Sequence, residues 1–347
     1  MFLKDESFEL GCIPMALKEY VLKRLVYSVI LIFAALTVNF LIFAMMPGDP
    51  LRQYMARVEL HTNEEQYEMM REQLGLNKPL HLRYLDYLVK MLTWNFGNGM
   101  IGGGAPVTEQ IMNRLPNTLI LMGFAAVLSI IAGIFIGVLV AYKRGGLFDT
   151  LAVTGSLVTY SVPIFFIGWL MMFFFAVQLH WFPLGGIAPR TWGRTPPTNA
   201  IEVLIGRISH LVLPTITLFL FSVGGWILLS RACVLETITE DYVVTARAKG
   251  LKERTVLYKH VLKNASLPLI TSVAMTFGFL ISGAIITETL FDYNGMGLLI
   301  WDAIRGGAAP DLPVLQAIFY VIALAVIVAN FIADLLYGVI DPRIKYG

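Results

Sequence analysis

The chain has 347 residues, of which 57% are hydrophobic and only 14% are charged, against roughly 25% charged residues in a typical soluble protein. This composition excludes an ordinary soluble globular protein and favours one embedded in lipid. The net charge of +2 is small and the basic residues form no single stripe, so nucleic acid is not an expected partner.

Residues 1–24 carry Lys4, Lys18, Lys23 and Arg24, and residues 25–46 then contain no charged side chain. That run is long enough to span a bilayer and longer than the roughly 7 to 15 apolar residues of a signal-peptide core. It therefore predicts an uncleaved first transmembrane helix. The run ends in Pro47-Gly48-Asp49-Pro50, where two prolines bracket a turn and stop the helix.

Five further apolar runs follow. They cover residues 117–142, 151–178, 211–230, 268–287 and 314–338. Pro163 and Pro214 are expected to interrupt or kink their helices, which membranes tolerate where neighbouring groups satisfy the freed carbonyls. The sequence thus predicts an all-α membrane protein with six transmembrane helices.

The largest soluble stretch is residues 47–116, in which residues 63–74 and 81–92 are predicted helices and residues 95–104 a glycine-rich loop. These glycines lack the Lys-Ser/Thr of a phosphate-binding P-loop, and Gly-Lys-Ser/Thr occurs nowhere in the chain. We therefore expect no ATP hydrolysis by this chain on its own.

The orientation of the helices follows from Lys and Arg in the segments between them. With the amino terminus inside, the cytoplasmic segments hold fifteen Lys and Arg, against four in the two shorter outside loops. The first outside loop is long enough to carry little weight. Residues 1–24, 231–267 and 339–347 are then cytoplasmic, and residues 47–116 and 288–313 are extracytoplasmic.

The cytoplasmic segment 231–267 predicts a helix-turn-helix. Thr237 and Glu240 have the Ser/Thr-x-x-Glu spacing of a capping box, so we expect a helix to begin there and run to Gly250. A second helix is expected from about Glu253 to Ala265, before Pro268 opens the next apolar run.

Small residues gather at the turn of this segment. Ala246, Ala248 and Gly250 lie close together in the sequence, and residues without bulk let another surface approach the backbone closely. The pattern favours a protruding hairpin that a partner can grip.

The segment DYVVTARAKGL, followed by HVLKNASLPLIT, resembles the cytoplasmic EAA loop of ABC transporter permeases of the dipeptide/oligopeptide/nickel class. Val244, Thr245 and Ala246 stand at the Glu-Ala-Ala positions, Gly250 at the motif glycine, and Leu267 with Pro268 at the Leu-Pro. The glutamate is missing and the spacer is longer than in sugar-type permeases, as is usual in the peptide class.

Other motifs of that family follow in the expected order. The first span ends in a similar PGDP, Phe291, Gly295 and Gly297 match a Phe-x-x-Pro-Gly-x-Gly pattern with Asn in place of Pro, and Asp341-Pro342-Arg343 matches the family's ending. The resemblance covers nearly the whole chain, least securely at residues 1–17 and at residues 191–199, which look like an insertion.

The resemblance implies a multi-pass subunit of the cytoplasmic (inner) membrane, with both termini cytoplasmic, that forms half of the pore of an ATP-driven importer of di- or oligopeptides. It implies as partners a second homologous permease, two ATP-binding subunits and an extracytoplasmic solute-binding protein. ATP and Mg are expected on those subunits, with no cofactor or metal in this chain. Oligosaccharides or nickel are the alternative cargo.

The same resemblance implies a coupling helix that docks on an ATP-binding subunit. The residues implied at that interface are Thr245, Ala246, Arg247, Lys249, Gly250, Leu251, Glu253 and Arg254.

The predicted spans contain no Asp, Glu, Lys, Arg or His between their ends, with Glu288 and Asp334 only near boundaries. An ion-driven carrier normally keeps an ionisable group at mid-membrane, so a secondary carrier is less favoured, as is a channel or a membrane-embedded enzyme. Neutral candidates for a translocation path are Ser161, Thr217, Ser222, Thr276 and Ser282. Such residues more often hydrogen-bond their own helix or a neighbour.

Two other groups of residues carry no predicted chemistry. The histidines, His61, His81, His180, His210 and His260, show no metal-ligand spacing and no catalytic pairing with a carboxylate. Asp302 and Arg305 have the spacing of an i, i+3 ion pair at a solvated helix end.

Overall fold

The computed structural model describes residues 15–46, 64–73, 77–99, 104–280, 284–305 and 310–340. Within these ranges the chain is helical, and its only β pairing is an isolated antiparallel bridge between Asn98 and Pro106. Several sequence predictions lie outside the described residues. They are Pro47 to Pro50, His61, Ser282 and Asp341 to Arg343.

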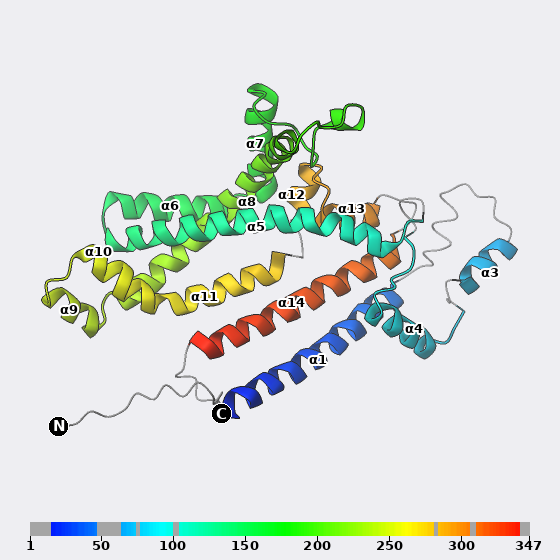
Figure 1. The fold of residues 1–347 in the computed structure, drawn as a ribbon, viewed down its shortest axis with the longest axis horizontal. Coiled ribbons are helices and arrows are strands. Elements are labelled where there is room, and N and C mark those ends of the chain that lie inside the picture. The colour runs from blue at the N-terminus through cyan, green and yellow to red at the C-terminus, as the bar shows by residue number, and fades with distance from the viewer. Residues whose placement is uncertain are drawn as a thin grey trace.

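Four long apolar helices form the body of the molecule (Figure 1): α1 (Met15–Ala44), α5 (Val107–Tyr142), α8 (Ala200–Thr237) and α14 (Leu312–Ile340). Each contains a stretch long and apolar enough to cross a membrane. They account for the predicted spans 25–46, 117–142, 211–230 and 314–338, and α8 is much longer than predicted because its polar ends remain helical.

The predicted span 151–178 is divided at Pro163. α6 (Leu147–Ser161) and α7 (Ile164–Met171), which continues as the π-helical η1 (Met172–Gln178), are bent by 98° relative to each other. Pro163 lacks the N–H that a continuous helix requires, so the predicted interruption at this proline is confirmed. The described residues thus hold four candidate spans, or five if this bent pair is one span.

The predicted span 268–287 also differs from a single helix. α10 (Glu253–Thr255), the π-helical η3 (Val256–Val261) and α11 (Leu262–Phe279) follow one another directly, and α12 (Ile285–Leu290) begins a separate element. Pro268 lies inside α11 rather than at its start, so the predicted helix end near Ala265 is wrong. The second helix of the hairpin and the apolar run are one continuous path.

The predicted capping box at Thr237 and Glu240 is not formed. Thr237 is the last residue of α8, and its hydroxyl donates a hydrogen bond to the Cys233 carbonyl at 2.9 Å. The next helix, α9 (Asp241–Ala248), begins without a side-chain cap. The sequence pattern was overridden because α8 extends beyond the apolar run and takes Thr237 into its final turn.

A side-chain cap does form at the other end of α8. The Asn199 carboxamide oxygen accepts a hydrogen bond from the Glu202 backbone N–H at 2.8 Å, and the Glu202 carboxylate accepts one from the Thr198 N–H at 2.9 Å. The segment 191–199, which includes part of η2 (Arg190–Gly193), therefore leads into the start of the longest helix.

The remaining helices lie at the two ends of the bundle. α3 (Glu64–Gln73) and α4 (Leu80–Leu92) confirm the two predicted helices of the soluble stretch, and α13 (Met296–Arg305) follows α12. Figure 1 shows α9 and α10 at one end, with the start of α1 and the end of α14 towards it, and α4 and α13 at the opposite end.

The tightest packing is between α5 and α8, which share the largest helix interface of the described residues. A Cβ atom at Gly133 would lie 2.2 Å from the Trp226 Cβ, and one at Gly137 would lie 2.6 Å from the Ser230 Cβ. Only glycine permits this approach. The pair has the Gly-x-x-x-Gly spacing that brings membrane helices together.

Candidate functional site

The hairpin predicted from the sequence is present between α8 and α11. α9 runs from Asp241 to Ala248, and α10 begins at Glu253 after a turn at Gly250. Gly250 has a φ of +74°, a conformation that L side chains rarely adopt, and no other atom lies within 4 Å of where its Cβ would be. The glycine is needed for the turn, and the space beside it is open.

The inner face of the hairpin is a hydrophobic cluster. Val243 and Ala246 of α9 pack with Val256 and Val261 of η3, and the cluster continues through residues of α5, α8 and α11. Val243, Val256 and Val261 are fully buried. The hairpin is therefore fixed to the helix bundle.

The outer face carries most of the residues predicted for a partner interface. Thr245, Arg247, Lys249, Gly250, Leu251 and Arg254 are exposed, and Glu253 is half-buried. Ala246 is buried inside the cluster, so its small side chain lets α9 pack closely against its own protein. Val244 and Tyr242, which are also exposed, extend the apolar part of this surface.

An ion pair closes the hairpin turn. The Arg247 guanidinium donates to the Glu253 carboxylate, with Nη2 2.7 Å and Nε 3.2 Å from Oε1. This hydrogen bonding raises the pKa of Arg247 above its ordinary value. The pair joins α9 to α10 across Gly250 and fixes the shape of the outer face.

A second ion pair ties the start of α6 to α8 near the hairpin. The Arg231 guanidinium binds the Asp149 carboxylate through two hydrogen bonds of 2.7 and 3.0 Å, and the Gly145 N–H donates to the same carboxylate at 2.9 Å. Two parallel bonds fix orientation as well as distance. The short loop between α5 and α6 is thereby held against α8.

The described residues predicted for a translocation path lie on three different helices. The hydroxyls of Ser161, Thr217 and Thr276 each donate to the carbonyl four residues earlier on their own helices, α6, α8 and α11. Thr217 is fully buried, while Ser222 and Thr276 are partly exposed. Ser161, Thr217 and Thr276 therefore show the intrahelical bonding that is common for such residues and that requires no role in the path.

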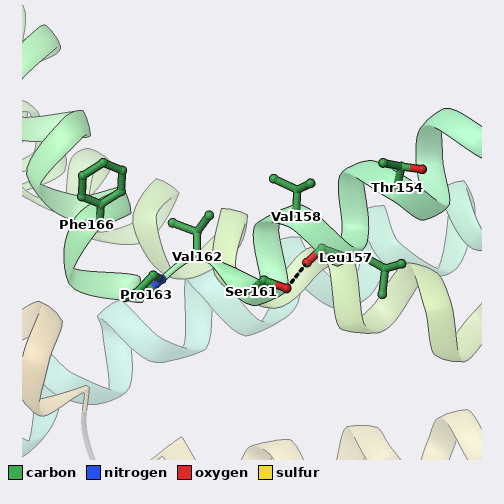
Figure 2. Close-up of a pocket in the computed structure, with 7 residues that line it drawn as sticks. All are labelled: Thr154, Leu157, Val158, Ser161, Val162, Pro163 and Phe166. Atoms are coloured by element: carbon green, nitrogen blue, oxygen red, sulfur yellow. Dashed lines mark hydrogen bonds between the residues drawn. The ribbon is translucent and has the colours of Figure 1, made fainter.

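Ser161 differs because it lines a groove. Figure 2 shows it beside the bend between α6 and α7. The groove that it lines has a volume of about 470 Å³. The lining is mostly apolar, and the Ser161 hydroxyl is bonded to the Leu157 carbonyl at 2.7 Å. The residues that line the groove are Thr154, Leu157, Val158, Ser161, Val162, Pro163 and Phe166.

Sequence reasoning missed a buried carboxylate. Glu288, predicted only near a span boundary, is fully buried on α12. Its carboxylate accepts hydrogen bonds from the Thr118 hydroxyl at 2.8 Å and from the backbone N–H groups of Gly297 and Leu298 at 2.7 and 3.2 Å. The Thr118 hydroxyl in turn accepts from the Met296 N–H at 2.7 Å. Glu288 thus joins the first turn of α13 to α5.

The Phe-x-x-Asn-Gly-x-Gly pattern is explained by this carboxylate. A Cβ at Gly295 would lie 2.3 Å from Glu288 Oε2, and one at Gly297 would lie 3.0 Å from it. Phe291 is buried, and its carbonyl accepts a hydrogen bond from the Gly186 N–H at 2.9 Å. An acidic residue beside a Gly-x-Gly was the available signal, since the glycines leave room for it.

The remaining polar predictions have local explanations. His210 is buried and its Nδ1 lies 2.7 Å from the Gly206 carbonyl oxygen, and the described residues hold no group of His, Cys, Asp or Glu that could bind a metal. The predicted Asp302–Arg305 pair is wrong. Asp302 pairs with Arg114 of α5 at 2.8 Å, and the Arg305 guanidinium lies over the Trp301 ring.

The described residues hold long apolar helices and a basic hairpin packed against them, and the comparison with protein families identifies the class of the protein. Residues 133–346 match the model of the binding-protein-dependent transport system inner membrane component, and residues 17–122 match the N-terminal model of such membrane components. The chain belongs to this family and is a multi-pass inner-membrane permease.

Individual relatives agree over nearly the full length. The chain is 34% identical to the probable peptide ABC transporter permease protein y4tP of Sinorhizobium fredii, over 94% of this chain and 99% of that protein. It is 35% identical to the oligopeptide transport system permease protein AppB of Bacillus subtilis and 34% identical to the dipeptide transport system permease protein DppB of Escherichia coli, with the same coverage.

A solved structure shares the fold. A chain of the inward-facing MetNI methionine ABC transporter matches with a TM-score of 0.53 at 15% identity, covering 67% of this chain and 97% of that one. At this identity the likeness concerns the fold alone.

Proposed function

We propose that this chain is the membrane-spanning permease of an ATP-driven importer of di- or oligopeptides, and that it forms half of the translocation pore. The observation that carries the proposal is the hairpin, whose inner face is packed into α5, α8 and α11 while its outer face is free. A partner that moves the outer face moves the bundle as a rigid body. The names of the relatives favour peptides over oligosaccharides or nickel as cargo.

The proposed topology has six spans. Four of them are α1, α5, α8 and α14, and the fifth is the bent pair of α6 and α7. The sixth is α11, which contains the shorter apolar stretch Pro268–Phe277. The start of α1 and the end of α14 lie towards the end of the bundle that carries α9 (Figure 1), which supports placing both termini and the hairpin in the cytoplasm.

The proposed partners follow from this arrangement. Two ATP-binding subunits hydrolyse ATP with Mg, and one of them contacts Thr245, Arg247, Lys249, Gly250, Leu251, Glu253 and Arg254. Ala246 supports this surface from behind. A second homologous permease completes the pore, and an extracytoplasmic solute-binding protein delivers the peptide.

The groove at the α6–α7 bend is the proposed section of the path. Because Pro163 has no N–H, the Thr159 carbonyl loses its helical donor, and such backbone is tolerated at membrane depth only inside protein or beside water. Ser161 and the other groove residues would then face the pore, whereas Thr217 packs between helices. The interrupted backbone at Pro163 therefore favours this groove, rather than the buried Thr217 hydroxyl, as part of the translocation path.

The hairpin assignment is tested by replacing Gly250 with Asn. Asn tolerates positive φ, and the space around Gly250 is open, so the chain should fold while a side chain now projects towards the partner. We expect loss of co-purifying ATP-binding subunits and of peptide uptake.

The matched control is Gly104→Asn, because Gly104 has a φ of +82°, equally open space, and a position just before α5 at the opposite end. Uptake should be retained in this control. Normal assembly and uptake in Gly250→Asn would reject the hairpin as the coupling element. Uptake driven by an ion gradient in vesicles that contain this chain alone would favour a secondary carrier instead.

A further inference from the structure

α4 has three distinct faces. Successive residues of a helix turn by about 100°, so Tyr84, Tyr87, Leu88 and Met91 share one face, and these side chains are buried or half-buried. Leu82, Leu85, Val89 and Leu92 form a second, apolar face that is exposed. Arg83, Asp86 and Lys90 form a third face that is charged, and Asp86 pairs with Lys78.

The first face fixes α4 against a membrane-spanning helix, below that helix's end. The Asn39 amide of α1 donates to the Tyr87 hydroxyl at 2.8 Å, and the hydroxyls of Thr37 and Tyr84 are hydrogen-bonded at 2.7 Å. Asn39 precedes the last residue of α1 by five positions, which is roughly 7 Å along the helix. With the end of α1 at the membrane surface, the contact lies at the depth where a bilayer passes from headgroups to acyl chains.

Exposed apolar side chains continue from α1 at the same level. Leu41, Ile42 and Met45 at the end of α1 are exposed, and Ile42 and Met45 are 62% and 78% accessible. Trp94, directly after α4, is also exposed and lies against the ring of Phe96. Tryptophan at a helix end is typical of the membrane interface.

We propose that α4 is an interfacial helix whose face of Leu82, Leu85, Val89 and Leu92 is embedded in the acyl chains of the leaflet opposite the hairpin. Its charged face then points to water. A helix with separate apolar and charged faces lies in the plane of the membrane interface, with its apolar face buried about 5 to 10 Å into the boundary between headgroups and acyl chains. The proposal rests on α1 crossing the membrane and does not depend on the cargo of the importer.

The embedded helix has a consequence for the soluble stretch. A binding protein that docks on this side meets the charged face of Arg83, Asp86 and Lys90, while the apolar face is covered by lipid. A protein partner on the apolar face would instead exclude both lipid and water, which gives the test three separable outcomes.

The test uses single cysteines along α4 in the full chain, purified from its own membranes with the subunits that stay bound. The native cysteines are first removed as Cys12→Ser and Cys233→Ala. Leu85→Cys and Val89→Cys report on the apolar face, and Asp86→Cys and Lys90→Cys are matched controls on the charged face. All four side chains are exposed, so each substitution should be tolerated.

Each cysteine is labelled with nitrobenzoxadiazole in vesicles of phosphatidylethanolamine and phosphatidylglycerol. We expect lipid carrying a nitroxide near the headgroup to quench positions 85 and 89 several-fold more than positions 86 and 90, and aqueous iodide to show the reverse order. Equal iodide quenching on both faces would overturn the proposal. Protection of positions 85 and 89 from both quenchers would also overturn it, in favour of a protein interface.

Discussion

The hydroxyl of Thr118 lies 2.8 Å from the Glu288 carboxylate, and both side chains are fully buried. The two residues are 170 positions apart, on α5 and α12, and the same hydroxyl accepts the Met296 N–H that opens α13. One threonine therefore serves three helices, and its removal leaves a buried carboxylate and a buried N–H short of a partner.

Replacing Thr118 with Val keeps the volume and removes these bonds. We expect a loss of about 2 to 6 kcal/mol in stability, because each of the two buried polar groups that lose this partner costs about 1 to 3 kcal/mol. Thermal unfolding of the purified protein in detergent measures the effect. Thr150→Val is the control, since the Thr150 hydroxyl is exposed and bonds only its own helix at Gly146; equal melting temperatures for the two variants would contradict the role of Thr118.

Gly295→Ala should disturb the same cradle from the other side. The new Cβ would lie 2.3 Å from Glu288 Oε2 and 2.5 Å from Thr118 Oγ1, so the carboxylate has to move and its bonds to α13 weaken. We expect a lower melting temperature than in Gly155→Ala, where the added Cβ meets open space in α6.

A double-mutant cycle identifies the cause. If the clash with the carboxylate dominates, Gly295→Ala should cost less in a Glu288→Ala background, and the coupling should exceed about 0.5 kcal/mol. Additive effects of the two substitutions would place the clash elsewhere.

Gly133→Ala and Gly137→Ala should separate α5 from α8. Their Cβ atoms would meet Trp226 and Ser230 at 2.2 and 2.6 Å, and overpacking of a close interface costs about 1 to 3 kcal/mol. Gly123→Ala on the same helix meets no atom within 4 Å and should be neutral or stabilising, by up to about 1 kcal/mol, because alanine favours helix. If Gly133→Ala or Gly137→Ala melted at the same temperature as Gly123→Ala or higher, the close approach of the two helices would be refuted.

The two ion pairs near the hairpin should differ in their contribution to stability. Asp149→Asn weakens a two-bond contact in which Asp149 is nearly buried, whereas Glu253→Gln weakens a pair whose Arg247 and Glu253 side chains are 41% and 34% exposed. Surface pairs contribute little. We expect Asp149→Asn to lower the melting temperature by a few degrees and Glu253→Gln to leave it almost unchanged. High salt should weaken the exposed Arg247–Glu253 pair more than the Arg231–Asp149 pair.

Hydropathy predicted the positions of the long helices because lipid-facing side chains are apolar whatever their neighbours. It did not predict where α8 begins and ends, because its polar terminal turns are held by local bonds such as that of Thr237. Proline alone did not predict where a helix ends. The helix breaks at Pro163, but α8 continues through Pro214, which is buried inside it.

The hairpin was predicted from its glycine, its small residues and the family motif, and its position in the sequence was correct. The inward direction of Ala246 was not, because its neighbours in η3 follow it by ten or more residues and pack from the opposite side. Glu288 could not be placed for the same reason: its partner Thr118 lies on a distant helix, and a single sequence contains no record of that contact.

The length of α8 has a mechanical consequence. Its 38 residues measure roughly 57 Å, nearly twice the hydrocarbon thickness of a bilayer, so one helix carries the Asn199 cap at one end and leads into the hairpin at the other. A tilt of about 10° around its midpoint would displace each tip by roughly 5 Å in opposite directions. In the proposed topology, this tilt of α8 would transmit a displacement of the hairpin to the other side of the membrane without a relay of small side-chain shifts.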